Sequence, residues 1–315
     1  MAAESAMSEL RRRSPGLFIR GFAMGTADVI PGVSGGTLAL ITGIYDELVR
    51  TIAGIDSGLV RLLLCRRWAA LWTHLNAGFL VPLLCGIGAA IVSFSRAIHF
   101  LLDHHPVPLG GFLTGLILAS ALVVSRRLQG DNMQAVNLSG LGLLIVGAAA
   151  GYGVTLLWPL ESGTQWYKFL LSGSIASVAM ILPGISGSFL LVIMGKYDQV
   201  IGAVNDFDLG ILIFFGSGFA AGILAFSRVL KFLLARYKAP TMTLLVGLMA
   251  GSVRRVWPFK RYQDTDGQAT ASVTETYDCI LPNNFDGEVI GAFVLMLIGF
   301  AGVLLLERLG RQDGR

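Results

Sequence analysis

Charged residues are scarce in this chain of 315 residues. Asp, Glu, Lys and Arg together make up 14% of the sequence, whereas 54% of the residues are hydrophobic and the mean hydropathy is +0.69. Soluble domains carry about 25% charged residues, so the composition excludes a soluble globular protein. It is typical of a chain whose solvent is the lipid bilayer, and it leaves no room for a separate soluble domain.

Cysteine is also rare, and the three cysteines are expected in an interfacial segment, a membrane span and a loop. They are Cys65, Cys85 and Cys279. No two of them are placed to pair, and no Cys or His cluster has the spacing of a metal site. The sequence therefore predicts no disulfide framework and no metal ion, and it indicates no cofactor.

The net charge is +4 and the isoelectric point is about 9.1. In a membrane protein, basic residues collect in cytoplasmic loops, so this excess does not indicate a nucleic-acid partner. The basic run Arg11, Arg12, Arg13 precedes an apolar stretch without a small-residue cleavage site. The N-terminus is therefore expected to be retained.

Long uncharged runs are what the sequence does have. The windows Leu138 to Trp158, Leu209 to Phe226 and Val289 to Leu306 carry almost no charge. About 20 apolar residues in a helix cross a hydrocarbon core of about 30 Å. The chain is therefore expected to cross the membrane several times.

The sequence contains an internal repeat. ADVIPGVSGGTLALITGIYDELV, from Ala27 to Val49, aligns without a gap to AMILPGISGSFLLVIMGKYDQVI, from Ala179 to Ile201, and ten of the 23 positions are identical. A second pair follows in each copy, FSRAIHFLL from Phe94 and FSRVLKFLL from Phe226. Two unrelated apolar segments would not be expected to share Pro, Gly, Ser, Tyr and Asp at the same positions, so the pattern indicates a duplication.

Each copy has a break inside its first apolar stretch, at Pro31-Gly32 and at Pro183-Gly184. Pro lacks an amide donor and Gly is conformationally permissive, so a regular helix cannot continue there. The flanks, such as Leu17 to Ile30 and Thr37 to Leu48, reach only to mid-membrane. Each break is therefore predicted to be the tip of a re-entrant helical hairpin that faces the protein interior.

The predicted fold is an all-α integral membrane protein with two inverted repeats, each a re-entrant hairpin followed by three transmembrane helices. Three spans per copy is an odd number, which requires the inversion, and this architecture is typical of secondary transporters. The predicted segments are a cytoplasmic tail 1–14; repeat 1 over 15–158, with hairpin 17–49, interfacial helix 57–75 and spans 76–102, 108–124 and 138–158; repeat 2 over 167–307, with hairpin 167–196 and spans 209–234, 241–253 and 287–307; and a cytoplasmic tail 308–315.

The distribution of basic residues tests this topology. With both termini in the cytoplasm, 14 basic residues lie inside, and the five outside are Lys196, Arg254, Arg255, Lys260 and Arg261. The four in the outer loop 254–286 oppose the assignment, but long loops are translocated largely regardless of charge. The balance favours cytoplasmic termini.

The two tips are the predicted anion site. Small residues and hydroxyls follow each break where a half-helix begins, and unpaired amides there favour negative charge. The predicted phosphate-binding residues of the tips are Ser34, Gly35, Gly36, Thr37, Ser186, Gly187 and Ser188. The alternative is that the hydroxyls only cap the half-helices while the glycines allow close packing.

Arg96 and Arg228 occupy equivalent positions in the two FSR motifs, within apolar spans. Charged groups there are costly and usually functional, so both are candidates for contacting an anionic headgroup, one from each leaflet. The alternative is that both side chains extend to the interface, because each lies about two turns from the end of its span.

Asp28 precedes the first break by three residues, and Met180 takes its place in the second copy. Such an asymmetry suits coupling to an ion gradient, with the carboxyl group binding a proton or helping to hold Na⁺. A capping or interhelical hydrogen bond is an equally good reading of Asp28. The segment 57–75 mixes arginines with leucines and tryptophans, as an interfacial helix on anionic lipids does.

At the hairpins the sequence resembles a family of bacterial polytopic membrane proteins, the polyprenyl-phosphate (undecaprenyl-phosphate) transporters. The motifs that carry the resemblance are GFAMGTADVIPGVSGGTLALITGIYDEL and AMILPGISGSFLLVIMGKYDQVI. The resemblance implies a transporter of the bacterial cytoplasmic membrane that returns the lipid carrier phosphate to the cytoplasmic leaflet after envelope polymers are assembled outside. The implied partners are the polyprenyl-phosphate lipid and membrane lipids.

Two alternatives stay open. Membrane undecaprenyl-pyrophosphate phosphatases have a similar Pro-Gly-x-Ser loop, but theirs continues with Arg where this chain has Gly35 and Gly187. They also carry paired glutamates, and none of the seven glutamates here pairs at helical spacing within a span, so no catalytic residues are predicted. A transporter of a small inorganic anion is the second alternative, because an anion cradle does not by itself recognise a prenyl chain.

Overall fold

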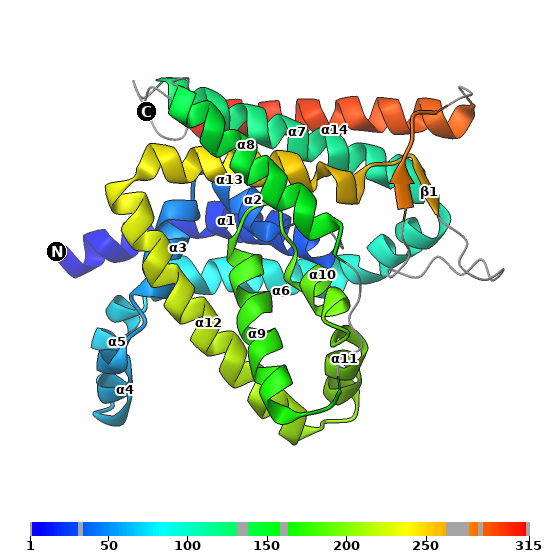
Figure 1. Cartoon of the computed structure of the whole chain (residues 1–315). Coiled ribbons are helices and arrows are strands. Elements are labelled where there is room, and N and C mark those ends of the chain that lie inside the picture. Colours follow the sequence, from blue (N-terminus) through cyan, green and yellow to red (C-terminus); the bar gives the residue numbers. More distant parts are fainter. Residues whose placement is uncertain are drawn as a thin grey trace.

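The structure is a computed structural model that describes residues 2–30, 34–130, 138–157, 163–262, 277–282 and 286–312. These ranges form helices and one small antiparallel sheet (Figure 1). The elements of the first half are α1 (Ala2–Val29), α2 (Gly35–Ile41), α3 (Tyr45–Ala53), α4 (Ser57–Leu64), α5 (Trp68–His74), α6 (Ala77–His104), α7 (Pro106–Gly130) and α8 (Leu138–Thr155). Those of the second half are α9 (Trp166–Ile181), α10 (Gly187–Ile193), α11 (Tyr197–Asn205), α12 (Leu209–Arg236), α13 (Lys238–Val256), β1 (Lys260–Tyr262), β2 (Tyr277–Cys279) and α14 (Gly287–Gln312).

Four of the described helices are long and apolar enough to cross a membrane. Their apolar windows are Ala77–Phe94, Pro106–Arg126, Leu209–Arg236 and Gly287–Leu305. Large apolar side chains on these helices are exposed in the isolated chain, for example Val92 at 83% and Leu297 at 70%. Lipid rather than water suits such surfaces. The prediction of an all-α membrane protein is confirmed, and the chain is a multi-pass membrane protein.

The helices differ from the predicted segments in several places. The predicted tail 1–14 is part of α1, which begins at Ala2. The predicted interfacial helix 57–75 is two short helices, α4 and α5, which extend from the body of the protein in Figure 1 and are separated by a turn at Arg66, with φ of 52°. The β1–β2 hairpin was not predicted at all. Pro31 and Gly32 lie outside the described residues, as does most of the loop 254–286.

The segment that follows each break is two helices rather than one. The first segment divides at Gly43 (φ 77°) between α2 and α3, and the second divides at Gly195 (φ 59°) between α10 and α11. Positive φ is easy for glycine and strained for other residues, so a glycine at this point ends the helix. The bounds of α10 and α11 are those of α2 and α3 shifted by 152 positions, so the aligned segments fold alike.

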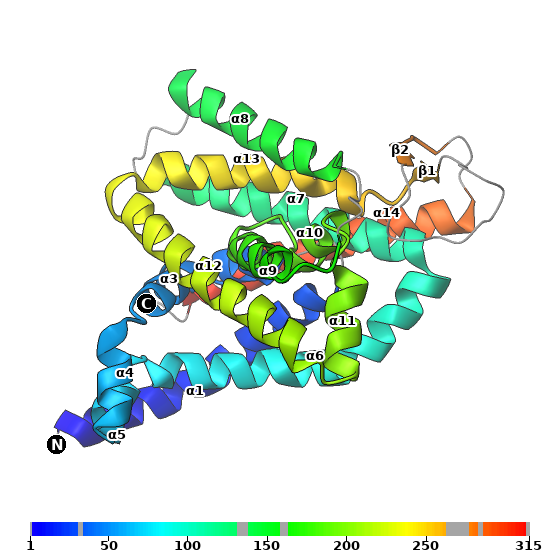
Figure 2. The same ribbon diagram turned by 60° about the horizontal axis from the view of Figure 1, so that its bottom comes forward.

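Helices of the two copies pair reciprocally. Helix α7 lies along α14, and α8 lies along α13, so the helix of the second predicted span of each copy pairs with the helix of the third predicted span of the other. Figure 2 shows α8 beside α13. Within each copy, α1 pairs with α6 and α9 with α12, and Figures 1 and 2 show α9 and α12 running at a steep angle to α1 and α6.

Glycines let these helix pairs approach closely. A Cβ on Gly115 of α7 would lie 1.9 Å from the carbonyl oxygen of Met296 in α14, and one on Gly247 of α13 would lie 2.3 Å from that of Leu144 in α8. Only a residue without a side chain fits at such contacts, as in other membrane helix pairs.

The first broken segment lies at the centre of the molecule. All residues of α2 are buried, and α2 contacts α1, α3, α7 and α9. Ile41 and Tyr45 belong to the main hydrophobic core, together with Leu83, Ile117 and Met249 from three other helices. Helix α2 is therefore surrounded by protein, as a short helix that does not cross the membrane requires if it lies at membrane depth.

Candidate anion-binding site

Residues that follow the first break contact the second break, and three side chains of the first copy take part in the hydrogen bonds. Ser34 Oγ donates to the carbonyl oxygen of Leu182 at 3.2 Å. The hydroxyl of Tyr45 donates to the carbonyl of Ile181 at 3.1 Å, and the amide of Gly184 donates to Thr37 Oγ1 at 3.0 Å. The last carbonyls of a helix have no partner within the helix. Side chains of the first half therefore satisfy the end of α9.

The predicted cradle of the first break is filled from within the chain. The Gly35 amide donates to Asp28 Oδ1 at 2.6 Å, and the Gly36 amide donates to Ser34 Oγ at 3.2 Å. A Cβ on Gly35 would lie 2.5 Å from Asp28 Oδ2, so a larger residue there would displace the carboxylate. These are the capping contacts that the sequence left as an alternative. In this conformation a substrate anion would meet the carboxylate of Asp28 here.

The second break lacks such a carboxylate. Met180 stands where the first copy has Asp28, and the hydroxyls of Ser186 and Ser188 are 2.7 Å apart. Gly184 has a φ of 91°, and a Cβ there would lie 2.7 Å from the Cα of Met249 in α13. The second break is thus pressed against α13 and carries hydroxyl groups without a neighbouring acid in the aligned motif.

A small open pocket with about 10 Å³ of space lies beside the second break. It is lined by residues of α8, the second break, α10 and α13: Gly151, Val154, Thr155, Gly184, Ile185, Ser186, Phe189, Ser252 and Arg255. This space holds about one water molecule and is far below the range of about 300–1,000 Å³ for pockets that enclose drug-sized molecules. In this conformation the pocket therefore does not enclose a headgroup. Its one cation is Arg255, and none of the described residues that line it is acidic.

Arg255 lies between aromatic rings. Its guanidinium carbon is 4.2 Å from the ring centre of Phe189 in α10 and 5.9 Å from that of Tyr277 in β2. Sequence reasoning named Arg255 only as an outer-loop residue and named neither Thr155 nor Ser252. The one available signal was the Arg254-Arg255 pair at the end of an apolar segment, but no pattern linked it to a break about 70 positions earlier.

The neighbouring cations fix the β1–β2 hairpin to the end of α13. Arg254 donates to the carbonyls of Tyr277 at 2.7 Å and Thr155 at 3.2 Å. Lys260 Nζ donates to the carbonyl of Arg255 at 2.7 Å and lies 4.6 Å from the ring centre of Tyr277. Burial of the ammonium group, with the positive charges of Arg255 and Arg254 nearby, lowers the pKa of Lys260 to about 7.

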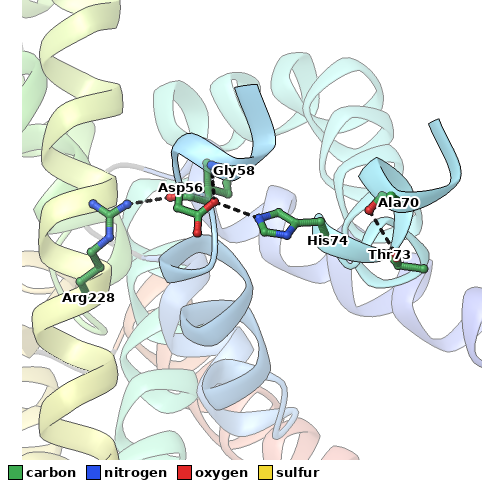
Figure 3. Close-up of polar contacts among 7 residues, drawn as sticks. Asp56, Gly58, Ala70, Thr73, His74 and Arg228 are labelled. Carbon is green, nitrogen blue, oxygen red and sulfur yellow. Dashed lines mark hydrogen bonds and ion pairs between the residues drawn. The ribbon is translucent and has the colours of Figure 1, made fainter. Parts of the chain in front are cut away.

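The two arginines of the FSR motifs lie elsewhere. Arg228 is exposed and donates from Nη2 to the carbonyl of Ile55 at 2.7 Å (Figure 3). The next residue, Asp56, caps α4 through the amide of Gly58 and lies 3.1 Å from His74 Nε2. Arg96 is exposed on α6. Neither arginine lines the pocket or bonds to a break among the described residues, so the structure brings together the tip residues but not these two.

Comparison with known proteins gives the family. Residues 24–274 match a family described as VCA0040-like, undecaprenyl phosphate translocase-like, and this range includes both breaks and the pocket. A polyprenyl-phosphate transporter of Vibrio cholerae is 44% identical over 243 residues, 77% of this chain and 77% of that protein. A polyprenyl-phosphate transporter of Staphylococcus aureus is 34% identical over 261 residues, 76% of this chain and 85% of that protein.

No solved structure matches the chain. Both relatives are named as transporters, and the matching family is not described as a family of enzymes. The resemblance seen in the hairpin motifs is confirmed over most of the sequence: this multi-pass membrane protein belongs to the undecaprenyl phosphate translocase-like family.

Proposed function

We propose that the protein is a flippase that returns polyprenyl phosphate from the outer to the cytoplasmic leaflet of the bacterial inner membrane. The observation that carries the proposal is the contact of Ser34, Thr37 and Tyr45, which follow the first break, with the second break. The names of the relatives supply the lipid. A charged headgroup cannot cross hydrocarbon unaided, so a site inside the protein must shield it.

The repeat supports an alternating-access mechanism. Two copies with matching helix bounds and reciprocal pairing of α7 with α14 and α8 with α13 suit two halves that exchange inward-open and outward-open arrangements. In this proposal each break is the tip of a re-entrant hairpin and the copies are inverted. The start of α1 and the end of α14 lie at the same side of the molecule in Figures 1 and 2, as expected if both termini are cytoplasmic.

Asp28 is the proposed coupling residue. It is the acid that distinguishes the first break from the second. Its carboxylate accepts a hydrogen bond from the amide of Gly35, the first residue of α2. Binding of H⁺ or Na⁺ by the carboxylate would weaken that bond and change how the first break is held. The coupling ion is thereby linked to the contact between the two halves.

A small-anion transporter is the second candidate, because hydroxyl groups such as those of Ser186 and Ser188 at the second break would bind an anion without recognising a prenyl chain. Hydrolysis of a pyrophosphate has less support. No glutamate pair occurs at helical spacing within a predicted span, and no acidic residue is among the described lining residues of the pocket.

Reconstitution in liposomes tests the proposal. Labelled undecaprenyl phosphate is placed in one leaflet, and its exchange is followed with and without a pH or Na⁺ gradient. We expect protein-dependent exchange that a gradient accelerates. Exchange of inorganic phosphate without the lipid would favour the small-anion transporter, and release of phosphate from undecaprenyl pyrophosphate without exchange would favour the enzyme.

A further inference from the structure

We propose that the structure is one of two gate states, in which α3 packed against α12 closes one side of the transporter while α11 stands open from α6 on the other side. In the second state α11 closes against α6, and Arg96 makes the contact that Arg228 makes here. This inference rests on the proposed alternating access, to which it adds the helices that form the two gates.

The repeat gives each of these helices a counterpart. The bounds of α11 are those of α3 shifted by 152 positions, and the bounds of α12 are those of α6 shifted by 132. The FSR motifs therefore lie at the same position in α6 and α12. A contact of α3 with α12 then has a counterpart in a contact of α11 with α6. A transporter that is open to one side forms only one of the two.

The contact between α3 and α12 closes the first gate. Val49 of α3 is 1% exposed and Leu230 of α12 is 2% exposed, and both belong to the main hydrophobic core. At the edge of this packing, Arg228 Nη2 donates to the carbonyl of Ile55 at 2.7 Å. Apolar packing thus holds this gate, and a polar contact joins the two copies at its rim.

The counterpart helix α11 makes no comparable contact with α6 among the described residues. Three apolar side chains of α11 and of the turn that follows it are exposed instead: Ile201 at 44%, Val204 at 51% and Phe207 at 79%. The aligned residues of the first copy are Val49, which is 1% exposed, and Ile52 and Ile55, which are half-buried. Apolar side chains at the same positions are thus packed in the first copy and uncovered in the second.

The face of α6 that would receive α11 is uncovered too. Ile91 and Phe94 are three positions apart, so they lie on one face of α6, and they are 44% and 40% exposed. Their counterparts in α12, Ile223 and Phe226, are partly buried and pack against the main core. Arg96 is exposed on the same helix. Both members of the second gate therefore present surfaces that are packed in the first gate, as expected of a pair with two discrete arrangements.

The two gates lie towards opposite ends of the molecule. Helix α3 lies at the end that carries the start of α1 and the end of α14, and α11 lies towards the other end (Figures 1 and 2). With cytoplasmic termini, the closed gate is the cytoplasmic one and the open gate is the outer one. This is the state that would receive a lipid phosphate from the outer leaflet.

Cysteine cross-linking in the full-length protein tests the two gates. The exposed native cysteines are first replaced by serine; they are Cys65, Cys85 and Cys279. The pair Ile55→Cys with Arg228→Cys reports the first gate. The pair Phe207→Cys with Arg96→Cys, at the equivalent positions of the other copies, reports the second gate.

The control pair is Ile55→Cys with Arg96→Cys, which combines one member of each gate. Ile55 lies near the start of α6, because Asn76 donates to Thr51 of the same segment at 3.2 Å. Arg96 lies about 30 Å further along that helix. The control pair should therefore not cross-link in either state.

A cleavable bifunctional thiol reagent is added to liposomes during exchange of undecaprenyl phosphate. We expect both gate pairs to cross-link and the control pair to stay separate. Either cross-link should lower the rate of exchange about tenfold or more, because each holds the protein in one of two states that must alternate. Cleavage by a reductant should restore exchange.

Serine at the uncovered positions of α11 separates gating from folding. Ile201→Ser with Val204→Ser removes contacts that form only in the second state. The maximal rate of exchange should therefore fall about threefold or more while the melting temperature in detergent stays that of the wild type. The matched control is Val294→Ser with Leu297→Ser, at exposed apolar positions of α14 with the same spacing, and it should change neither quantity.

The outcomes separate this inference from the proposed function. If Phe207→Cys and Arg96→Cys never cross-link in a protein that exchanges lipid, or if exchange continues after either gate is cross-linked, the inference is overturned and the lipid transporter stands. Failure of the Ile55→Cys and Arg228→Cys pair to cross-link would also overturn it. Cross-linking of both gate pairs in a protein that moves no undecaprenyl phosphate would support the two gates and overturn the proposed substrate.

Discussion

The hydroxyl of Tyr45 donates a hydrogen bond to the carbonyl of Ile181, across 136 positions of sequence. Tyr45 begins α3 in the first copy and is 2% exposed, and Ile181 is the last residue of α9 in the second. A buried carbonyl without a partner is costly. The bond therefore ties the fold of the second break to the first copy.

Tyr45→Phe tests this tie. The ring stays in the core, but the carbonyl of Ile181 loses its donor, so we expect the protein to be destabilised by about 1–3 kcal/mol. The melting temperature in detergent measures the loss. Tyr197→Phe changes the aligned, half-buried tyrosine of α11 and serves as the control, because it should shift the melting temperature little. Equal shifts in both variants would contradict the proposed role of the bond.

Gly247→Val should abolish the folded protein. A Cβ at this position would lie 2.3 Å from the carbonyl oxygen of Leu144, on the backbone of the paired helix α8, which cannot move aside without separating α8 from α13. Gly153→Val is the matched control in α8, since nothing lies within 4 Å of a Cβ there. Size-exclusion profiles of the two purified variants provide the measurement, and a monodisperse Gly247→Val protein would show the pairing to be looser than described.

Asp28→Asn separates the charge of the carboxylate from its hydrogen bond. The amide oxygen of asparagine can still accept from the Gly35 amide, so the fold should be retained. Exchange of lipid should persist but lose its response to the pH or Na⁺ gradient, because the titratable or ion-binding group is gone. Asp28→Ala removes the bond as well and should also lower stability by about 1 kcal/mol. A gradient response that survives in Asp28→Asn would place the coupling elsewhere.

Lys260 should make stability depend on pH. Its pKa is lowered to about 7 from the ordinary value of 10.5, mainly by burial. Between these two values the unfolded state binds more protons than the folded state, so stability should increase as pH rises through this window and fall as pH is lowered towards 7. One proton corresponds to a slope of at most about 1.4 kcal/mol per pH unit.

Melting temperatures at pH 7, 8 and 9 measure this slope. Lys260→Met should flatten it relative to wild type, whereas Lys231→Met, at an exposed position of α12, should leave it unchanged. If the wild type and Lys260→Met have parallel profiles, Lys260 is not the group responsible.

Arg228→Gln should loosen the segment that follows α3. Its donation to the Ile55 carbonyl joins α12 of the second copy to the start of the α4–α5 segment. We expect faster hydrogen exchange in residues 55–64, with KM for the lipid unchanged because Arg228 does not line the pocket. A raised KM would instead favour the earlier hypothesis that the FSR arginines meet the headgroup, and Arg96→Gln should then show the same effect.

Local patterns in the sequence predicted much of the architecture. The aligned motifs predicted the positions of the helix breaks, because Pro, Gly and Ser at this spacing are compatible with few backbone conformations. The uncharged runs predicted the long helices. They did not predict that the segment after each break divides into two helices, although Gly43 and Gly195 mark the point of division. An isolated glycine in an apolar run is also common within membrane helices, so its positive φ was not evident.

The pocket was harder to predict because its parts are distant in sequence. Phe189 looks like an ordinary core residue, and Arg255 looks like an ordinary loop cation, until α10 and α13 are placed side by side. For Asp28, the structure shows the capping interaction that the sequence offered as an alternative, because its carboxylate accepts a hydrogen bond from the Gly35 amide. Ion coupling by Asp28 stays a prediction.

The exchange of partners between the copies has a consequence for biosynthesis. Helices α7 and α8 leave the ribosome well before α13 and α14, the helices against which they lie. During translation the glycine-lined faces of α7 and α8 therefore lack their partner helices and contact only lipid or the insertion machinery. A nascent chain arrested before α14 would hold Gly111 and Gly115 without their partner, so the first half cannot reach its final form until the last helix is made.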